Sequence, residues 1–175
     1  MKRKYTKKQL ALLIIGLAMM LTGLSILGFF GVRKIVRMIH KQKLLSENPV
    51  LEIPALDIKA PVLEGVEQEV LKEGAGHFPG TGAIGEGNYC IAAHSSVLYK
   101  EYFNELKNAE YGMEVLLSPK DGEPVQYTVT KMFIVEPNET WILNDFDDCR
   151  ITMVTCTDDG SQRRIVVASK VDTAS

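Results

Sequence analysis

A cysteine at the end of an apolar run is the residue of this sequence best suited to covalent chemistry. Residues 151–156 read Ile-Thr-Met-Val-Thr-Cys, and a second apolar run begins eight positions after Cys156, at Arg164 and directly after Arg163. We interpret the two runs as strands joined by a short polar turn. A thiolate at this strand end could attack a carbonyl carbon, and a guanidinium on the next strand could stabilise the resulting oxyanion. The pattern predicts acyl transfer.

Acyl transfer by a thiol also needs a group that moves protons, and histidine is the commonest choice. The chain has three histidines: His94 ends an apolar run, His77 lies in a segment rich in glycine and proline, and His40 lies in a basic N-terminal segment that excludes it. We predict that His94 is the general acid of the first half-reaction and the general base of the second. His77 is the alternative, and a structural role is the other explanation for a histidine at a strand end.

The other two cysteines fit this chemistry less well. The polar residues 157–160 follow Cys156 and place it beside solvent, whereas a buried cysteine packs as a small apolar residue. Cys90 shares strand parity with His94, but core packing is expected for it, with a second nucleophile as the alternative. Cys149 follows two aspartates, which disfavour its thiolate. No Cys-x-x-Cys motif occurs in the sequence, so neither a thioredoxin-type site nor a disulfide scaffold is predicted.

These motifs, in this order, resemble the sortases, the membrane-anchored cysteine transpeptidases of Gram-positive bacteria. The family signature is Thr-Leu-x-Thr-Cys, and positions 152–156 read Thr-Met-Val-Thr-Cys. Met153 replaces the leucine of the signature, a substitution that conserves volume. The resemblance covers roughly residues 51–171, together with the N-terminal anchor. Three further segments resemble the family: 76–81, 85–88 and 103–106.

The resemblance implies catalytic roles for Cys156, His94 and one arginine, while His77 corresponds to a non-catalytic histidine of the family. Adjacent residues on a strand point to opposite faces, so only one arginine can face Cys156. Most sortases place the arginine directly before the apolar run, which favours Arg164. Some leave one residue between, which favours Arg163. We predict Arg164, with Arg163 as the alternative.

Several aspartates flank the candidate site in the sequence. They are Asp145, Asp147, Asp148, Asp158 and Asp159. Some sortases bind Ca²⁺ through loop carboxylates, but the spacings here match no calcium-binding loop, and a solvated rim of charge is the simpler interpretation. We expect no cofactor and no required metal. A large gain in activity on adding Ca²⁺ would contradict this expectation.

The N-terminal residues predict a membrane anchor. Residues 10–32 contain no charged side chain, and as a helix they would extend about 35 Å, enough for a bilayer core of about 30 Å. A cleaved signal peptide, the alternative, would have a shorter apolar region. We assign residues 1–9 to a basic cytoplasmic tail and residues 33–49 to a basic juxtamembrane segment and linker. Five basic residues lie on each side of the span, so charge does not fix its orientation; the resemblance implies a single-pass protein of the cell membrane with an extracytoplasmic catalytic domain.

Residues 50–175 form the catalytic domain that the resemblance implies. Its many short apolar runs predict a mostly β fold, and the family fold is a closed eight-stranded β-barrel with short helices. Residues 44–175 carry 22 acidic and ten basic side chains, a net charge near −12 (10 − 22) that argues against nucleic-acid binding. The expected strands are 51–58, 61–63, 88–94, 113–117, 125–135, 150–156 and 163–171, with a short helix over 67–73, a loop over 74–87, a helix that follows Ser95 and ends near Gly112, and a polar loop over 136–148.

The resemblance also implies a reaction. The protein would cleave a C-terminal Leu-Pro-x-Thr-Gly-like sorting signal of secreted surface proteins and join the new carboxyl end, through a thioester on Cys156, to an amine of a peptidoglycan precursor or a pilin-type acceptor. Two other functions fit the residues: an anchored cysteine peptidase that only hydrolyses, and a non-enzymatic anchored β-barrel that binds a partner. The six-residue turn 157–162, with no recognisable lid segment before the domain, favours protein anchoring over pilus assembly.

Overall fold

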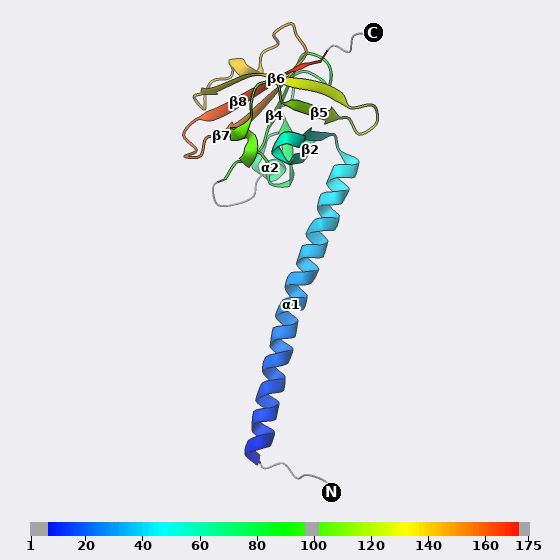
Figure 1. Ribbon diagram of the computed structural model, residues 1–175, viewed down its shortest axis with the longest axis vertical. Coiled ribbons are helices and arrows are strands. Elements are labelled where there is room, and N and C mark those ends of the chain that lie inside the picture. Colours follow the sequence, from blue (N-terminus) through cyan, green and yellow to red (C-terminus); the bar gives the residue numbers. More distant parts are fainter. Residues whose placement is uncertain (1–6, 97–101, 172–175) are drawn as a thin grey trace. The chain divides into compact units, whose positions relative to one another are not determined.

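The computed structural model describes residues 7–96 and 102–171 (Figure 1). The chain divides into two compact units, Met1–Lys43 and Leu44–Ser175. The first unit is helical where it is described, and the second contains the β-sheet.

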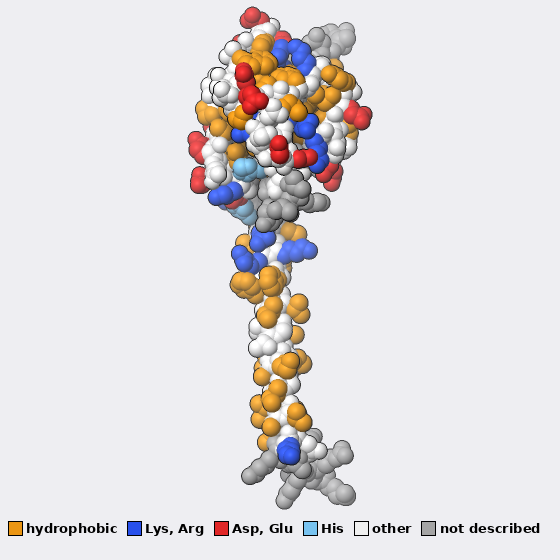
Figure 2. Space-filling view, turned by 90° about the vertical axis from the view of Figure 1, so that its left-hand side faces the viewer, with side chains coloured by type: hydrophobic (Ala, Val, Ile, Leu, Met, Phe, Trp, Pro, Cys, Tyr) orange, Lys and Arg blue, Asp and Glu red, His pale blue; other side chains and the backbone are white. Residues whose placement is uncertain are grey.

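Helix α1 (Lys7–Glu47) contains the apolar N-terminal stretch. Leu, Ile, Met and Ala favour the helix, and its hydroxyl groups are satisfied internally: Thr22 Oγ1 donates to the Met19 carbonyl and Ser25 Oγ donates to the Leu21 carbonyl, each over 2.9 Å. Exposed apolar side chains cover much of its length (Figure 2). By length and composition, it is the one helix in the described part of the chain that could cross a bilayer.

The helix continues beyond the predicted span, through the basic segment and into the stretch that we expected to be a linker. It ends at Glu47, where the Asn48 backbone N–H makes the last helical bond to the Leu44 carbonyl (3.2 Å) and the Asn48 side-chain amide donates to the same carbonyl (2.9 Å). Pro49 follows and lacks the N–H that a further helical turn requires. Residues 44–47 are therefore helical.

Eight strands in the described residues of the second unit close into a barrel, in the order β1-β2-β3-β4-β7-β8-β6-β5. Their bounds are β1 (Val50–Ile53), β2 (Ile58–Glu64), β3 (Ala75–His77), β4 (Asn88–Ala92), β5 (Glu114–Ser118), β6 (Val125–Val135), β7 (Arg150–Cys156) and β8 (Arg163–Lys170). Short helices lie between them: η1 (Pro54–Leu56), α2 (Gln68–Glu73), η2 (Asn104–Asn108) and η3 (Trp141–Leu143). This architecture confirms the predicted fold class.

Side chains of β7 alternate between the barrel interior and an outer face. Ile151 and Met153 belong to the interior core. Val154 belongs to a second cluster outside the barrel, where it packs with Ile165 of β8 under Ile142 of η3. The name "outer face" is used below for this side of β4, β7, β8 and β6, to which the even-numbered residues of β7 point.

Three segments of the second unit differ from the prediction. The expected strand 51–58 is divided, because β1 ends at Ile53 and the 3₁₀ helix η1, which begins with Pro54, separates it from β2.

Strand β3 lies in the segment expected to be a loop. Its central residue must be glycine, because a Cβ added to Gly76 would lie 2.2 Å from the Gly65 carbonyl oxygen. A glycine inside a strand is typical of a loop sequence, so the strand was not predicted. The helix expected after Ser95 falls partly on residues 97–101, outside the described residues. Its described part is the short 3₁₀ helix η2, which ends before the predicted boundary.

Candidate active site

Cys156 ends strand β7 directly opposite Arg163, the first residue of β8. Directly opposed residues of antiparallel strands project from the same face, so both side chains belong to the outer face. Both residues are half-buried, which leaves each of them accessible from solvent. The thiol and a guanidinium therefore share one end of the outer face.

The same register places Arg164 opposite Thr155, which shares the interior-facing parity of β7. This differs from the prediction that Arg164 faces Cys156. That prediction counted residues from the apolar run, whereas the pairing of β7 with β8 decides which face each residue takes. The geometry favours Arg163, and the catalytic role of either arginine stays a prediction.

The turn between β7 and β8 is held by its own side chains. Asp159 accepts hydrogen bonds from Thr157 Oγ1 (2.6 Å) and from Ser161 N and Oγ (3.1 and 2.8 Å), and these bonds lower the pKa of its carboxyl to about 2. Arg163 Nη1 donates to the carbonyls of Gly160 (3.3 Å) and Gln162 (3.1 Å). The turn thus holds one arm of the Arg163 guanidinium.

His94 lies just beyond β4, the parallel neighbour of β7. The last pair of the two strands is Ala92 with Val154, and His94 and Cys156 each follow that pair by two residues. The pairing continues past the strand end, because Ala93 N–H donates to the Val154 carbonyl over 3.2 Å. The structure thus brings the predicted histidine and cysteine to the same end of two adjacent strands.

His77 lies elsewhere and is engaged on both ring nitrogens. It pairs with Ile91 of β4, a core residue, and is therefore on the interior side. Its Nδ1 lies 2.8 Å from Glu64 Oε2 and its Nε2 lies 3.0 Å from Thr81 Oγ1. Its ring stacks on Tyr89 with centroids 4.2 Å apart. These contacts support a structural role for His77.

The two remaining cysteines differ from Cys156 in their surroundings. Cys90 is fully buried, and burial raises the pKa of its thiol to about 11. Cys149 is half-buried, and burial, followed by the nearby Asp148 carboxylate, raises the pKa of its thiol. Both thiols are therefore less available as thiolates than an ordinary cysteine.

A buried asparagine fixes the segment between β6 and β7 over the outer face. Asn88 is 2% exposed, and its Nδ2 donates to the carbonyls of Ile142 (2.9 Å) and Asn144 (2.8 Å). Its Oδ1 accepts a 2.7 Å bond from Thr152 Oγ1. Sequence reasoning missed this residue, and the only local signal was the apolar Trp-Ile-Leu at 141–143 in an otherwise polar segment.

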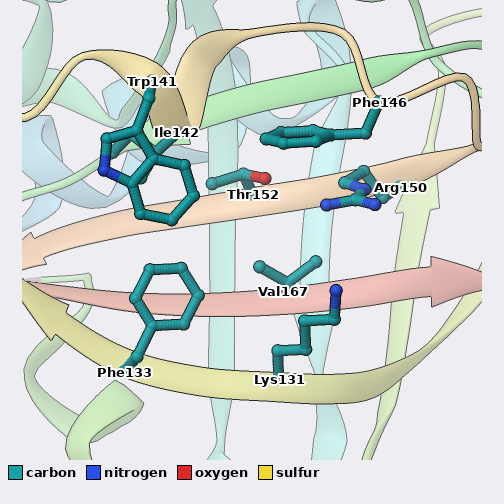
Figure 3. Close-up of a pocket in the computed structure, with 8 residues that line it drawn as sticks. All are labelled: Lys131, Phe133, Trp141, Ile142, Phe146, Arg150, Thr152 and Val167. Atoms are coloured by element: carbon teal, nitrogen blue, oxygen red, sulfur yellow. The ribbon is translucent and has the colours of Figure 1, made fainter.

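A pocket of about 120 Å³ lies between that segment and the outer face (Figure 3). Ile142 and Val167 line it together with aromatic and basic side chains. In the described part of the chain, no group of three or more His, Cys, Asp or Glu side chains is arranged to hold a metal ion.

Fold and site together define a class: a closed β-barrel with a cysteine, a histidine and an arginine at one end of its outer face. The family model of the sortase domain matches residues 51–171. That match covers well over half of the chain. The chain belongs to the sortase family.

Two curated relatives and one solved structure show the extent of the similarity. The chain is 30% identical over 128 residues to a sortase A of Streptococcus agalactiae, covering 70% of this chain and 51% of the relative. It is 27% identical over 125 residues to a sortase A of Bacillus anthracis, covering 70% and 59%. The chain thus spans about half of the length of these relatives. A structure of the Clostridium perfringens sortase D5 transpeptidase shares 30% identity at a TM-score of 0.65, covering 75% of this chain and 86% of that one.

Proposed function

We propose that this protein is a cysteine transpeptidase in which Cys156 is the nucleophile, His94 the acid and base, and Arg163 the oxyanion-stabilising cation. The observation that carries the proposal is the register that sets Cys156 opposite Arg163 and beside the strand that leads to His94. Membership of the sortase family supports the same class of reaction.

In the first half-reaction, the Cys156 thiolate attacks a threonine carbonyl carbon of the donor polypeptide and forms a C–S bond. The charge that develops on the carbonyl oxygen is stabilised by hydrogen bonds from Arg163. The C–N bond then breaks, and protonated His94 gives its proton to the leaving amine. A thioester on Cys156 and a released amine remain.

In the second half-reaction, an acceptor amine attacks the thioester carbon. Neutral His94 takes a proton from that amine, the C–S bond breaks, and Cys156 leaves as a thiolate. One amide bond is broken and one is formed, so the cycle needs no oxidant and returns the thiolate and the protonated imidazole to their starting states.

The outer face suits a donor of the Leu-Pro-x-Thr-Gly type in an extended conformation. Its leucine is three residues before the reacting threonine, which is about 10 Å at about 3.3 Å per residue. Along the outer face, Val154 and Ile165 lie about 7 Å from the level of Cys156, and Val167 lies about 13 Å from it. An apolar side chain at about 10 Å would therefore rest between apolar residues.

Helix α1, which is long and apolar enough to cross a bilayer, supports the proposal that this is a single-pass protein of the cell membrane. Its catalytic domain is proposed to lie outside the cytoplasm, the orientation that membership of the sortase family implies. In this orientation the site would meet secreted surface proteins as donors, and a peptidoglycan precursor or a pilin-type amine as acceptor. A membrane-impermeant thiol reagent should then label Cys156 in intact Gram-positive cells. Labelling only after lysis would contradict this orientation.

The reaction is tested with the full chain in detergent, fluorescent sorting-motif peptides and a triglycine acceptor, with products identified by mass spectrometry. We expect a ligated product that disappears with Cys156→Ala, while far-UV circular dichroism shows that the variant stays folded. Cys149→Ala is the matched control and should retain activity.

Each other outcome identifies a different function. Cleavage without ligation, even with several acceptor amines, would indicate a peptidase. Full activity of Cys156→Ala would show that Cys156 is not the nucleophile. A Cys156 thiol that resists alkylation in the folded protein, with no turnover of any peptide, would support a non-enzymatic binding barrel.

A further inference from the structure

The pocket on the outer face has an aromatic wall (Figure 3). Phe133 of β6 stacks on Trp141 of η3, with ring centroids 5.6 Å apart and planes 10° apart. Phe146 meets Trp141 edge to face at 6.5 Å and 89°. Trp141 is 45% exposed, so this wall is open to a ligand. Stacked rings of this kind offer rigid apolar area at little cost in conformational entropy.

Two cations face the other part of the pocket. The Arg150 guanidinium lies 4.2 Å from the centroid of the Phe146 ring, and Lys131 points toward Arg150 across Val167 (Figure 3). Nε and Nη2 of Arg150 donate to the Asp148 carboxylate, and Nη1 is the guanidinium nitrogen that does not contact this carboxylate. Lys131 has no acidic partner among the residues that the structure describes. Asp148 balances the charge of Arg150, so Lys131 supplies the positive charge of the pocket that has no described acidic partner, in a unit (Leu44–Ser175) that carries 22 acidic and ten basic side chains.

The strand register measures how far these cations are from the thiol. The pairs along the outer face, from the thiol outward, are Cys156–Arg163, Val154–Ile165, Thr152–Val167 and Arg150–Ser169. Lys131 pairs with Val167 from the other side. Successive pairs are about 7 Å apart, so the cations lie about 13 to 20 Å from the thiol.

An extended polypeptide advances at the same rise per residue as a strand. A donor bound along the outer face therefore passes the cations about four to six residues before its reacting residue. The part of the donor that precedes the cleaved bond stays on the enzyme as the thioester, while the leaving segment departs and the acceptor enters. The outer face from Val154 to Arg150 can therefore bind this retained part of the donor throughout the cycle.

We propose that Lys131 and Arg150 form a subsite for an acidic side chain of the donor, at the fifth to seventh residue counted back from the cleaved bond. This proposal rests on the proposed function. Carboxylate is the complementary charge, and the Phe146 ring covers one side of the Arg150 guanidinium, which strengthens the attraction by excluding water there. The subsite makes the enzyme select donors by the sequence that precedes the sorting motif.

Matched donor peptides test the subsite with the full chain in detergent. They share one sorting motif and differ only in Glu, Gln or Lys at the fifth, sixth or seventh residue before the cleaved bond. At low ionic strength we expect kcat/KM to be about two- to fivefold higher for the best Glu donor than for its Gln partner. Lys131→Glu should abolish that preference and favour the Lys donor, and 0.5 M salt should reduce it, since salt screens exposed charges. Lys120→Glu makes the same charge change in the exposed turn between β5 and β6 and should preserve the preference.

Binding of the same peptides to Cys156→Ala, measured by fluorescence anisotropy, separates the subsite from the reaction. Turnover with equal kcat/KM for Glu and Gln donors, or an equal preference in the wild type and Lys131→Glu, overturns the subsite and leaves the transpeptidase intact. Absence of turnover, with tighter and Lys131-dependent binding of the Glu peptide, overturns the reaction and keeps the subsite. Absence of both overturns both.

Discussion

The Thr155 hydroxyl donates a 2.8 Å hydrogen bond to the carbonyl oxygen of Ala93, and so joins the residue before Cys156 to the residue before His94. Thr155 is buried, and the Ala93 N–H donates in turn to the Val154 carbonyl over 3.2 Å. These two bonds fasten the ends of β4 and β7 to each other. They therefore set the spacing of the thiol and the imidazole.

Removing this hydroxyl should affect the reaction more than the fold. Thr155→Val keeps the shape of the side chain but loses the bond, so we expect a loss of about 1 kcal/mol in the free energy of unfolding. We expect kcat to fall about 10- to 100-fold, because a small misplacement of reacting groups is costly. Urea unfolding and steady-state kinetics measure the two effects, and Thr155→Ser should restore both. A wild-type kcat in Thr155→Val would show that the bond does not position the site.

The strand register makes a clear prediction for the paired arginines. Arg163→Ala should lower kcat about 10²- to 10³-fold, the usual cost of losing one oxyanion donor. Arg164→Ala should leave kcat close to the wild-type value, because its backbone position is opposite Thr155 rather than Cys156. The measurement is peptide transpeptidation at saturating donor. The opposite ranking would restore Arg164 as the catalytic cation.

The two histidines of the domain should separate chemistry from stability. His94→Ala should lower kcat/KM about 10²- to 10⁴-fold with little change in unfolding free energy. His77→Ala should retain most of the kcat but lose about 1 to 3 kcal/mol of stability, because it removes a buried ring that stacks on Tyr89 and the hydrogen bond between that ring and Thr81. Kinetics and urea unfolding on the same preparations decide this. Loss of kcat in His77→Ala with unchanged stability would contradict the assignment.

Asn88 should act on substrate binding through the segment that it holds. Asn88→Asp replaces the Nδ2 amide group, which donates both bonds, with a carboxylate oxygen that faces the carbonyls of Ile142 and Asn144. We expect this repulsion to displace the segment and to raise KM for the donor about tenfold or more, since buried groups left without partners cost about 1 to 3 kcal/mol.

Two further readouts exclude a merely structural role for Asn88. Amide hydrogen exchange in residues 136–149 should become faster in Asn88→Asp, while the rate at which iodoacetamide alkylates Cys156 stays unchanged. The kcat should change much less than KM. If kcat and the rate of Cys156 alkylation fall by the same factor, the whole site is disturbed instead.

Burial of Cys90 predicts a loss of stability in alkaline solution. Its folded-state pKa is raised to about 11, above the reference value of 9.0, so the folded state favours the neutral thiol. This contribution is fully present below pH 9 and is lost as the pH rises through about 11. It amounts to at most about 2 to 3 kcal/mol. Unfolding free energies at pH 8 and at pH 10.5 should therefore differ more in the wild type than in Cys90→Ala, and equal differences would contradict the assignment.

Local patterns in the sequence were sufficient for the strand that carries the thiol. The predicted strand 150–156 and the bounds of β7 (Arg150–Cys156) agree, because an apolar run between polar turns is a local property. His94 was expected to end a strand and lies two residues beyond β4. The mostly β fold class followed from the number of short apolar runs, which is also local.

The features that sequence reasoning missed depend on pairing between distant segments. Arg163 and Arg164 differ only in which residue of β7 each one faces, and no pattern within residues 163–171 encodes that register. The bonds from Asn88 to the carbonyls of Ile142 and Asn144 cross more than fifty positions of chain. Gly76 read as a loop residue although it belongs to a strand. A local sequence pattern cannot predict any of these features, because each depends on a neighbour that is remote in sequence.

The parallel pairing of β4 with β7 also has a consequence for the folding pathway. Residues 94 and 156 lie 62 positions apart (156 − 94), about half of the domain's sequence, and closing so long a loop has an entropic cost that slows the formation of such contacts. The thiol acquires its imidazole neighbour only when this pairing has formed. During refolding from urea, transpeptidation should therefore return with the phase that closes the barrel, and a chain whose barrel is still open carries only an ordinary, inactive cysteine.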